Sequence, residues 1–357
     1  MRAARRQTAV LALAALLAVA ASGCEVGYLA RAAYEEGRLL WNRRPISDEL
    51  TNPGLDPEHR DALAMVLKVR EFARERLGLN VGGAYRTISQ VDQDAIVWVV
   101  MAAPATSLRP LTWWFPIVGS VPYRGYFART QAEAEAQSLG DEGYDTLVRP
   151  AVAFSSLGFF DDPLLSNLLA LNRVVLAGTV IHELFHRTFF LASNVTFDES
   201  AATWVGSRGA AEFFAETEGP TSRDAVAARA VVASNLTFAR FLLQAQAQLL
   251  RLYGSGLPKN EILRRRKALF AQIRTDYARL KPSLSGLDRF DLDRHPLNNA
   301  ALLDYLLYFH NLWDFDALDR LSHHNLPATI KAIITLAQND PQDPFYAVWR
   351  ATHLPSH

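Results

Sequence analysis

The chain is poor in cysteine: Cys24 is the only one among its 357 residues. A single cysteine cannot form an internal disulfide, and it cannot build a zinc site from several thiolates. Its position close to the N-terminus also excludes thiol catalysis within the domain that follows. A metal ion bound to this protein must therefore be held by histidines and carboxylates.

A net charge is missing as well, because Lys and Arg together number 37 and Asp and Glu together also number 37. No basic cluster stands out, so a nucleic-acid partner is not expected. The sequence shows no internal repeat and no charge block of the kind that indicates disorder. Half of the residues are hydrophobic, which is typical of a globular protein with a sizeable core.

The first 23 residues have the composition of a secretory signal. Three arginines within the first six residues precede an apolar stretch over 8–21, which is too short to span a membrane comfortably. The sequence ASGC at 21–24 resembles a bacterial lipobox, although Ala21 replaces the more usual Leu. We therefore expect cleavage after residue 23 and attachment of acyl chains to Cys24, which would anchor the mature protein in a membrane.

This anchor would hold the protein at the bacterial cell envelope, facing the periplasm. Glu25 follows the cysteine instead of the Asp associated with inner-membrane retention in enterobacteria, which favours the outer membrane. Two alternatives stay open: an uncleaved N-terminal anchor, and a secreted protein in which the cysteine is incidental.

Residues 24–357 are expected to form one domain, with an α+β half over about 45–160 and a helical half over 161–357. In the first half, apolar periodicity predicts a helix over 56–77. The β-rich run IVWVVM predicts a buried strand at 96–101. A helix over 130–139 and a pair of strands over 144–155 complete this half.

The second half is expected to contain helices only. Asp161-Asp162-Pro163 is expected to cap the first of them. Apolar positions at core spacing predict helices over residues 164–191, 199–216, 222–252, 259–280, 299–321 and 327–337. A small sheet half followed by a larger helical half predicts the α+β class.

The motif HELFH at residues 182–186 lies within the first helix of the second half. His182 and His186 share one helical face, so both imidazoles can reach a single ion about 2.0–2.1 Å from each ring nitrogen. Glu183 leaves the helix at another angle and is placed to act as a base beside the metal, not as a ligand. The spacing therefore predicts one Zn²⁺ ion, with Glu183 activating the attacking water.

The flanks of the motif favour a metal site over a chance match. VI at 180–181 precedes it and FF at 189–190 follows it shortly after. Two histidines and a carboxylate on so apolar a helix are costly to bury unless an ion satisfies them. Arg187 departs from this pattern, because such flanks are usually uncharged.

A catalytic zinc ion also needs a third protein ligand and an open fourth position. Twelve residues separate His186 from Glu199, and SNVT at 193–196 is a natural turn that can bring a second helix back along the first. A third histidine six residues after His186 is excluded, because Ala192 stands there. We therefore predict Glu199 as the third ligand, although an acidic residue in a first helical turn is stabilising in its own right.

These motifs resemble the bacterial putative aminopeptidase family, zinc-dependent lipoproteins related to the gluzincins. The matching segments are GCEVGY (23–28), RRPI (43–46), AAP (102–104), WFPIVG (114–119), YRGYF (123–127), SLGFFDDP (156–163), HELFH (182–186), FDES (197–200) and NNA (298–300). The family usually has Asn where this chain has Asp198, and a small or polar residue where it has Arg187, but neither change removes a ligand. The resemblance implies a zinc peptidase with a thermolysin-like zincin fold, in which a mixed sheet lies above the active-site helix.

The resemblance also implies a donor for the oxyanion that develops during peptide hydrolysis. In related gluzincins, a Tyr or His on a later helix has this role. Tyr308 is the favoured candidate, with His310, Tyr123 and Tyr126 as alternatives. Each tyrosine could instead be a buried ring with its hydroxyl at the surface.

The sequence thus predicts a zinc-dependent metallopeptidase acting on peptides, with aminopeptidase action as the expected activity. An endopeptidase is the alternative within the same class. A lipid-anchored zinc-binding protein without catalysis is the alternative from another class. An intact Glu183 disfavours that alternative, because a purely structural zinc site needs no base.

Overall fold

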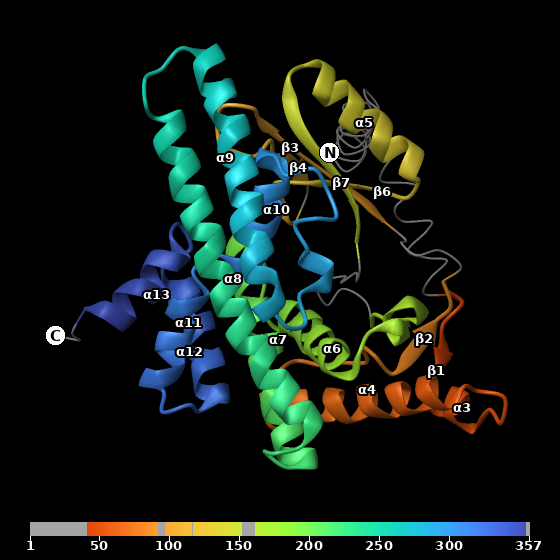
Figure 1. The fold of residues 1–357 in the computed structure, drawn as a ribbon. Helices are drawn as coiled ribbons and strands as arrows, with labels where there is room; N and C mark the ends of the chain where they lie inside the picture. The colour runs from red at the N-terminus through yellow and green to blue at the C-terminus, as the bar shows by residue number, and fades with distance from the viewer. Residues whose placement is uncertain (1–40, 92–96, 116, 152–160, 355–357) are drawn as a thin grey trace, which may run out of the picture.

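The computed structural model describes residues 41–91, 97–115, 117–151 and 161–354 (Figure 1). The signal over 1–23, Cys24 and the following residues up to 40 lie outside this part of the chain. So do Ile96 and the first five residues of the SLGFFDDP segment. The expectations that concern these residues are therefore left as they stand.

The largest sheet is antiparallel and has β3 at its centre. Its order is β6 (Arg124–Tyr126), β3 (Trp98–Pro104) and β7 (Tyr144–Pro150). Side chains of β3 alternate between two buried layers, as a strand requires. Val99 and Met101 join the main core, whereas Val100 and Ala102 pack under helix α5 (Arg129–Asp141). The predicted buried strand is thus confirmed from residue 98 onward.

Two smaller sheets flank this one. A mixed sheet consists of β1 (Arg44–Pro45), β2 (Thr87–Ser89) and β8 (Leu164–Leu165). A hairpin is formed by β4 (Trp113–Phe115) and β5 (Gly119–Val121). The hairpin is tied to the turn after the HELFH helix, because the Ser193 amide donates to the Val118 carbonyl at 3.0 Å.

Helices make up most of the remaining structure. They are α3 (Ile46–Thr51), α4 (Pro57–Glu75), α6 (Arg173–Thr188), α7 (Val195–Glu218), α8 (Arg223–Tyr253), α9 (Lys259–Leu280), α10 (Asn299–Phe309), α11 (Leu312–Leu321), α12 (Leu326–Asn339) and α13 (Pro344–His353). Helix α8 is long and apolar enough to cross a membrane. Core helices of globular proteins pass the same test, and Phe238, Leu242 and Leu249 of α8 lie in the core.

The predicted start of the HELFH helix is wrong. Residues 164–165 form β8, which pairs in parallel with β2, and α6 begins only after Asn172. Asn172 caps the helix, because its Oδ1 accepts a hydrogen bond from the Val175 amide at 3.0 Å. Asp161 does not cap a helix; its carboxylate instead accepts from the Gly83 amide at 2.8 Å. The prediction failed because periodicity alone cannot distinguish the apolar pair Leu164-Leu165 from a turn of a helix.

The predicted single helix over 299–321 is also wrong, because it is two helices. Asn311 has a φ of 49°, a left-handed conformation that no helix interior contains, and it separates α10 from α11. Helix α7 begins at Val195, four residues before the expected start, and α13 was not predicted. Glu199 consequently lies in the second turn of its helix.

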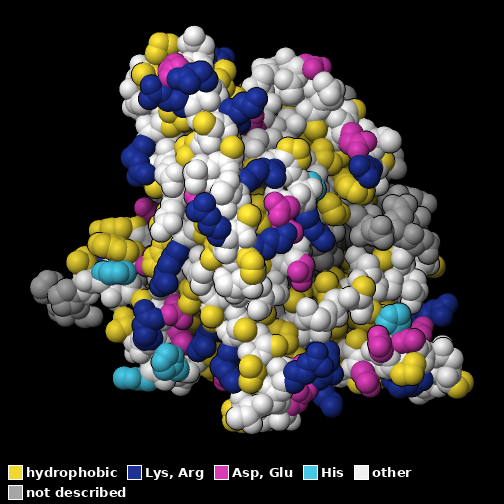
Figure 2. All heavy atoms as spheres, in the orientation of Figure 1, with side chains coloured by type: hydrophobic (Ala, Val, Ile, Leu, Met, Phe, Trp, Pro, Cys, Tyr) yellow, Lys and Arg dark blue, Asp and Glu magenta, His cyan; other side chains and the backbone are white. Residues whose placement is uncertain are grey.

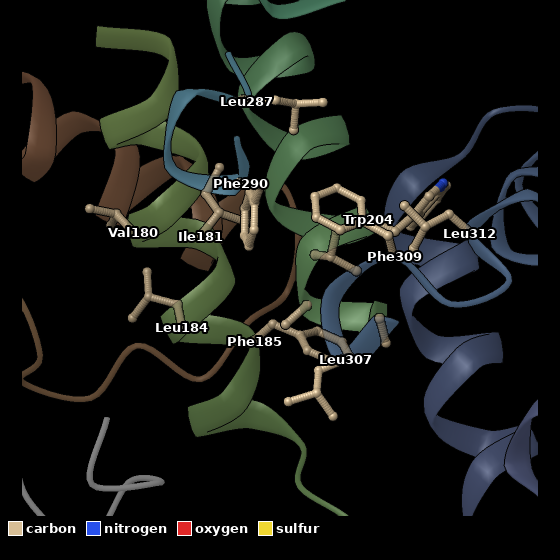
Figure 3. Close-up of a cluster of buried hydrophobic side chains, with 14 of the residues drawn as sticks. Val180, Ile181, Leu184, Phe185, Trp204, Leu287, Phe290, Leu307, Phe309 and Leu312 are labelled. Carbon is tan, nitrogen blue, oxygen red and sulfur yellow. The ribbon is translucent and has the colours of Figure 1, made fainter. Parts of the chain in front are cut away.

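One continuous apolar core joins the two halves, from Ile46 in α3 to Val348 in α13. Helix α6 lies inside it, in contact with α4, α7 and α8. Figure 3 shows Ile181, Leu184 and Phe185 of α6 directed into this core. The observed arrangement agrees with the α+β class, whereas the thermolysin-like zincin layout stays a prediction.

Candidate metal centre

Helix α6 positions the two histidines of the motif. His182 and His186 are each only 6% exposed, so their rings are held inside the protein and not on its surface. The ring centroids are 4.7 Å apart, as expected for side chains one helical turn apart. The two Nε2 atoms approach to 3.1 Å.

Helix α7 brings the carboxylate to the same point. It runs back along α6 and approaches it most closely where two glycines face each other, Gly178 on α6 and Gly206 on α7. A Cβ on Gly206 would lie 2.5 Å from the Gly178 carbonyl oxygen and 3.2 Å from the His182 Cβ. Only glycine permits so close a backbone contact at residue 206. Glu199, seven residues earlier on α7, is thereby set beside the histidines.

The three side chains converge on one point. Glu199 Oε2 lies 3.2 Å from His182 Nε2 and 3.5 Å from His186 Nε2. Zinc bonds of about 2.1 Å in a tetrahedron would place ligand atoms ~3.4 Å apart, which matches these separations. The donor set is two imidazoles and a carboxylate, with no cysteine. These residues can hold a metal ion, and they fit zinc.

Within this group, His186 and Glu199 form a charged pair when no metal is bound. Burial lowers the pKa of His186, but the Glu199 carboxylate and its hydrogen bond outweigh that effect and raise the pKa to about 9. Burial raises the pKa of Glu199, yet the two histidines hold it well below its usual range. An imidazolium and a carboxylate therefore face each other at neutral pH, and a cation entering the site displaces the proton.

Glu183 leaves α6 between the two histidines and is half-buried. Its charge helps to raise the pKa of His186 and also the pKa values of Tyr85 and Tyr123, after the larger effect of burial in each tyrosine. The carboxylate is therefore close to these side chains, but it is not one of the three that converge. Its role as a base stays a prediction.

Tyr308 reaches the site from α10. Its ring centroid lies 6.4 Å from that of His182. Its hydroxyl oxygen accepts a hydrogen bond from Arg149 Nη2 at 3.2 Å. Arg149, on β7, is fixed in turn by Asp304, whose two carboxylate oxygens accept from Nε at 2.8 and 2.7 Å.

The other candidates for the oxyanion donor divide into two groups. Tyr123 lies close enough to Glu199 for that charge to raise its pKa, after the larger effect of burial. Tyr126 packs with the cluster under α5 on the other layer of the sheet. The His310 ring packs against Phe345, with centroids 4.8 Å apart. The structure thus brings Tyr308 and Tyr123, but not Tyr126 or His310, to the converging side chains.

The two departures from the family pattern have local explanations. Asp198 is 1% exposed, and both of its oxygens accept from the Leu191 amide, at 3.1 and 3.2 Å. Burial raises its pKa to about 8, so at neutral pH it is largely an uncharged acid and resembles the Asn that it replaces. The side chain of Arg187 is only 11% exposed, and it pairs with Asp161 at 3.0 Å.

Sequence reasoning missed several residues that build the site. Arg149 and Asp304 lie 155 positions apart, so no local pattern connects them, although each is an isolated charge in an apolar segment. Tyr85 was missed as well: it is buried near Glu183 with a φ of 58°, which is rare for a residue with a side chain. The sequence held one signal for the contact between Gly178 and Gly206: each of two apolar helices contains a glycine.

One of the three comparisons with known proteins gives a match. A family model described as "Putative aminopeptidase" matches residues 27–345, which is most of the chain. The chain matches no curated protein and no solved structure. The family resemblance expected from the sequence motifs is therefore confirmed.

Replacing Gly206 with alanine should weaken metal binding at least ~10-fold, as is typical when the support of a ligand is disturbed. The added methyl group would overlap the Gly178 carbonyl and press on His182, so α7 must move away with Glu199. Gly178→Ala is the matched control, since its Cβ would meet Gly206 oxygen at an ordinary 3.5 Å. Titration of both metal-free variants with Zn²⁺ by calorimetry measures the difference. Equal affinities would contradict the role given to this contact.

Proposed function

The chain belongs to the putative aminopeptidase family, and from this premise we propose that it is a zinc-dependent peptidase. The observation that carries the proposal is the convergence of His182, His186 and Glu199 within 3.5 Å of one another, with Glu183 next to His182 on the same helix. A structural zinc site would normally have four protein ligands, and the described residues offer three here. The position left over is where water and substrate would enter.

A bound zinc ion would lower the pKa of a water molecule and polarise the scissile carbonyl. Glu183 would take the proton from the attacking water and deliver it to the nitrogen of the leaving amine. Because Glu183 is half-buried, its carboxylate can contact both solvent and a bound substrate. Two histidines held at 3.1 Å by the helix need little rearrangement for this reaction.

Tyr308 is the proposed donor to the oxyanion. A phenol carries one hydrogen, and Arg149 donates to the Tyr308 oxygen instead of accepting from it. The hydroxyl hydrogen is therefore directed to a different acceptor, and the ring lies against His182. The ion pair with Asp304 holds Arg149 in place, and Arg149 in turn fixes the hydroxyl oxygen of Tyr308. Oxyanion stabilisation requires such a preorganised donor.

Aminopeptidase action is the form of peptide hydrolysis that the family description supports. Endopeptidase action uses the same metal site and differs only in how the substrate amine is held. A zinc-binding protein without catalysis remains the alternative from another class, and the presence of Glu183 next to the ligands argues against it. Hydrolysis of peptides with free and with acetylated N-termini separates the first two.

We also propose that the enzyme is held at the bacterial cell envelope by acyl chains on Cys24. The support for this is the arginine-rich start, the apolar stretch and the ASGC sequence of the first 24 residues. In this arrangement the peptidase domain faces the periplasm, with the outer membrane favoured by Glu25. The substrates would then be peptides of the periplasm.

Glu183→Gln should lower kcat at least ~1000-fold while one zinc ion per chain is retained, because the amide cannot accept the proton of water. Turnover of a peptide panel and metal analysis by mass spectrometry check this. Glu133→Gln, the same change on the exposed face of α5, should leave kcat unaltered. Full activity of Glu183→Gln would refute the mechanism, and a zinc-loaded wild type without turnover would favour the non-catalytic alternative.

Tyr308→Phe should reduce kcat about 100-fold with KM changed less than about threefold, because the lost hydrogen bond forms mainly in the transition state. Steady-state kinetics on one good peptide give both constants. Tyr126→Phe serves as control, since that ring lies under α5, and its kcat should stay within about twofold of wild type. An effect of Tyr308→Phe confined to KM would assign the tyrosine to substrate binding alone.

Cys24→Ser should release the protein from membranes, since serine cannot form the thioether that carries the acyl chains. Fractionation of bacterial cells producing each form, followed by immunoblotting, measures the shift from pellet to soluble fraction. A serine variant that still sediments with membranes would instead support the uncleaved anchor.

A further inference from the structure

A cavity of about 60 Å³ begins at His182 and runs away from the metal ligands between α6, α7 and α8. Its position follows from helical spacing. On α7, Thr203 and Ser207 follow Glu199 at intervals of four residues, and on α6 Gly178 precedes His182 by four. Residues at this spacing share a helix face, so the cavity is a continuation of the two faces that carry the ligands.

The remaining wall comes from α8, from the segment before α10 and from the end of α10. Val231 and Asn235 line it on α8, and Phe290 and Phe309 close it on the other side. Figure 3 shows Phe290 beside Ile181 of α6. Phe290 also packs on Tyr308, with ring centroids 5.1 Å apart. The cavity is therefore next to both a proposed ligand and the proposed oxyanion donor.

The chemistry of the wall is apolar with a few neutral polar groups. Apart from His182, the described residues that line the cavity have side chains that cannot ionise. Thr203 is 8% exposed, and its hydroxyl has no hydrogen-bond partner among the residues that the structure describes. Asn235 is 6% exposed. A volume of 60 Å³ holds about four water-sized groups, which suits a side chain and not a whole residue.

We infer that this cavity is a specificity pocket for a compact, uncharged side chain adjoining the scissile bond, with Ser207, Thr203 and Asn235 in its wall. The inference rests on the proposed peptidase function. A peptide whose carbonyl lies at the metal centre has its neighbouring side chains within a few ångströms, and the space beside His182 receives one of them. Burial of a charged side chain there would leave it unpaired, which is strongly unfavourable.

Peptide panels test the inference, with the residue on each side of the scissile bond varied among Gly, Leu, Thr, Lys and Glu. At one of the two positions, the wild type should show kcat/KM at least ~10-fold higher for Leu and Thr than for Lys and Glu. Ser207→Leu, which fills the cavity, should lower kcat/KM for Leu at least ~10-fold and leave Gly within about threefold. Thr217→Leu, the matched control, adds the same side chain at an exposed position of α7 outside the cavity and should change neither.

Asn235→Asp provides a second variant that does not depend on filling the cavity. A carboxylate in the wall should raise kcat/KM for Lys relative to Leu at least ~10-fold. Equal loss on all peptides by a folded, zinc-loaded Ser207→Leu protein would overturn the inference, as would no gain for Lys in Asn235→Asp. Turnover without side-chain preference would overturn it and leave the peptidase function intact. Absence of turnover by the wild type would overturn both the inferred pocket and the proposed peptidase function.

Discussion

The backbone contact between Gly178 and Gly206 is the constraint on which the rest of the site depends. Two helices with ordinary side chains at their crossing lie 8–10 Å apart, and small residues allow a closer approach. Here the approach places a carboxylate within 3.5 Å of two imidazoles that belong to a different helix. Without it, the HELFH motif would be a pair of buried histidines with no third partner.

The buried charges of the site are paired with one another before metal enters. His186 and Glu199 compensate each other, and Arg149 and Asp304 form a second buried pair beside Tyr308. A buried ion pair contributes little net stability, but loss of one partner leaves a costly isolated charge. The arrangement therefore fixes positions more than it stabilises the fold. Asp198, next to Glu199 in sequence, avoids a third buried charge because its raised pKa keeps it largely protonated.

Much of this site could be predicted because it is encoded locally. The two histidines and Glu183 lie within one helical turn, and the turn before α7 explained how Glu199 returns to them. Helix limits were harder, since Leu164-Leu165 looks helical until a parallel partner, β2, is known. Contacts between distant segments could not be read at all. Arg149 and Asp304 meet only because β7 packs against α10, a fact of tertiary structure.

Helix α10 lies far from the strands in the sequence, but it is in contact with β3 and β7 in the fold. Its first residues are bound to the sheet: Asn298 donates to the Thr146 carbonyl of β7 at 2.9 Å, and Asn299 donates to the Pro104 carbonyl of β3 at 2.8 Å. Its last turn carries Tyr308 to His182, which α6 holds in the helical core. The N-terminal end of α10 is thus bound to the strands, and its C-terminal end lies near the histidines. The last turn is also bound to α7, because the Ser200 hydroxyl donates to the Leu307 carbonyl at 2.8 Å, so the phenol and the imidazoles lie on elements that are packed together.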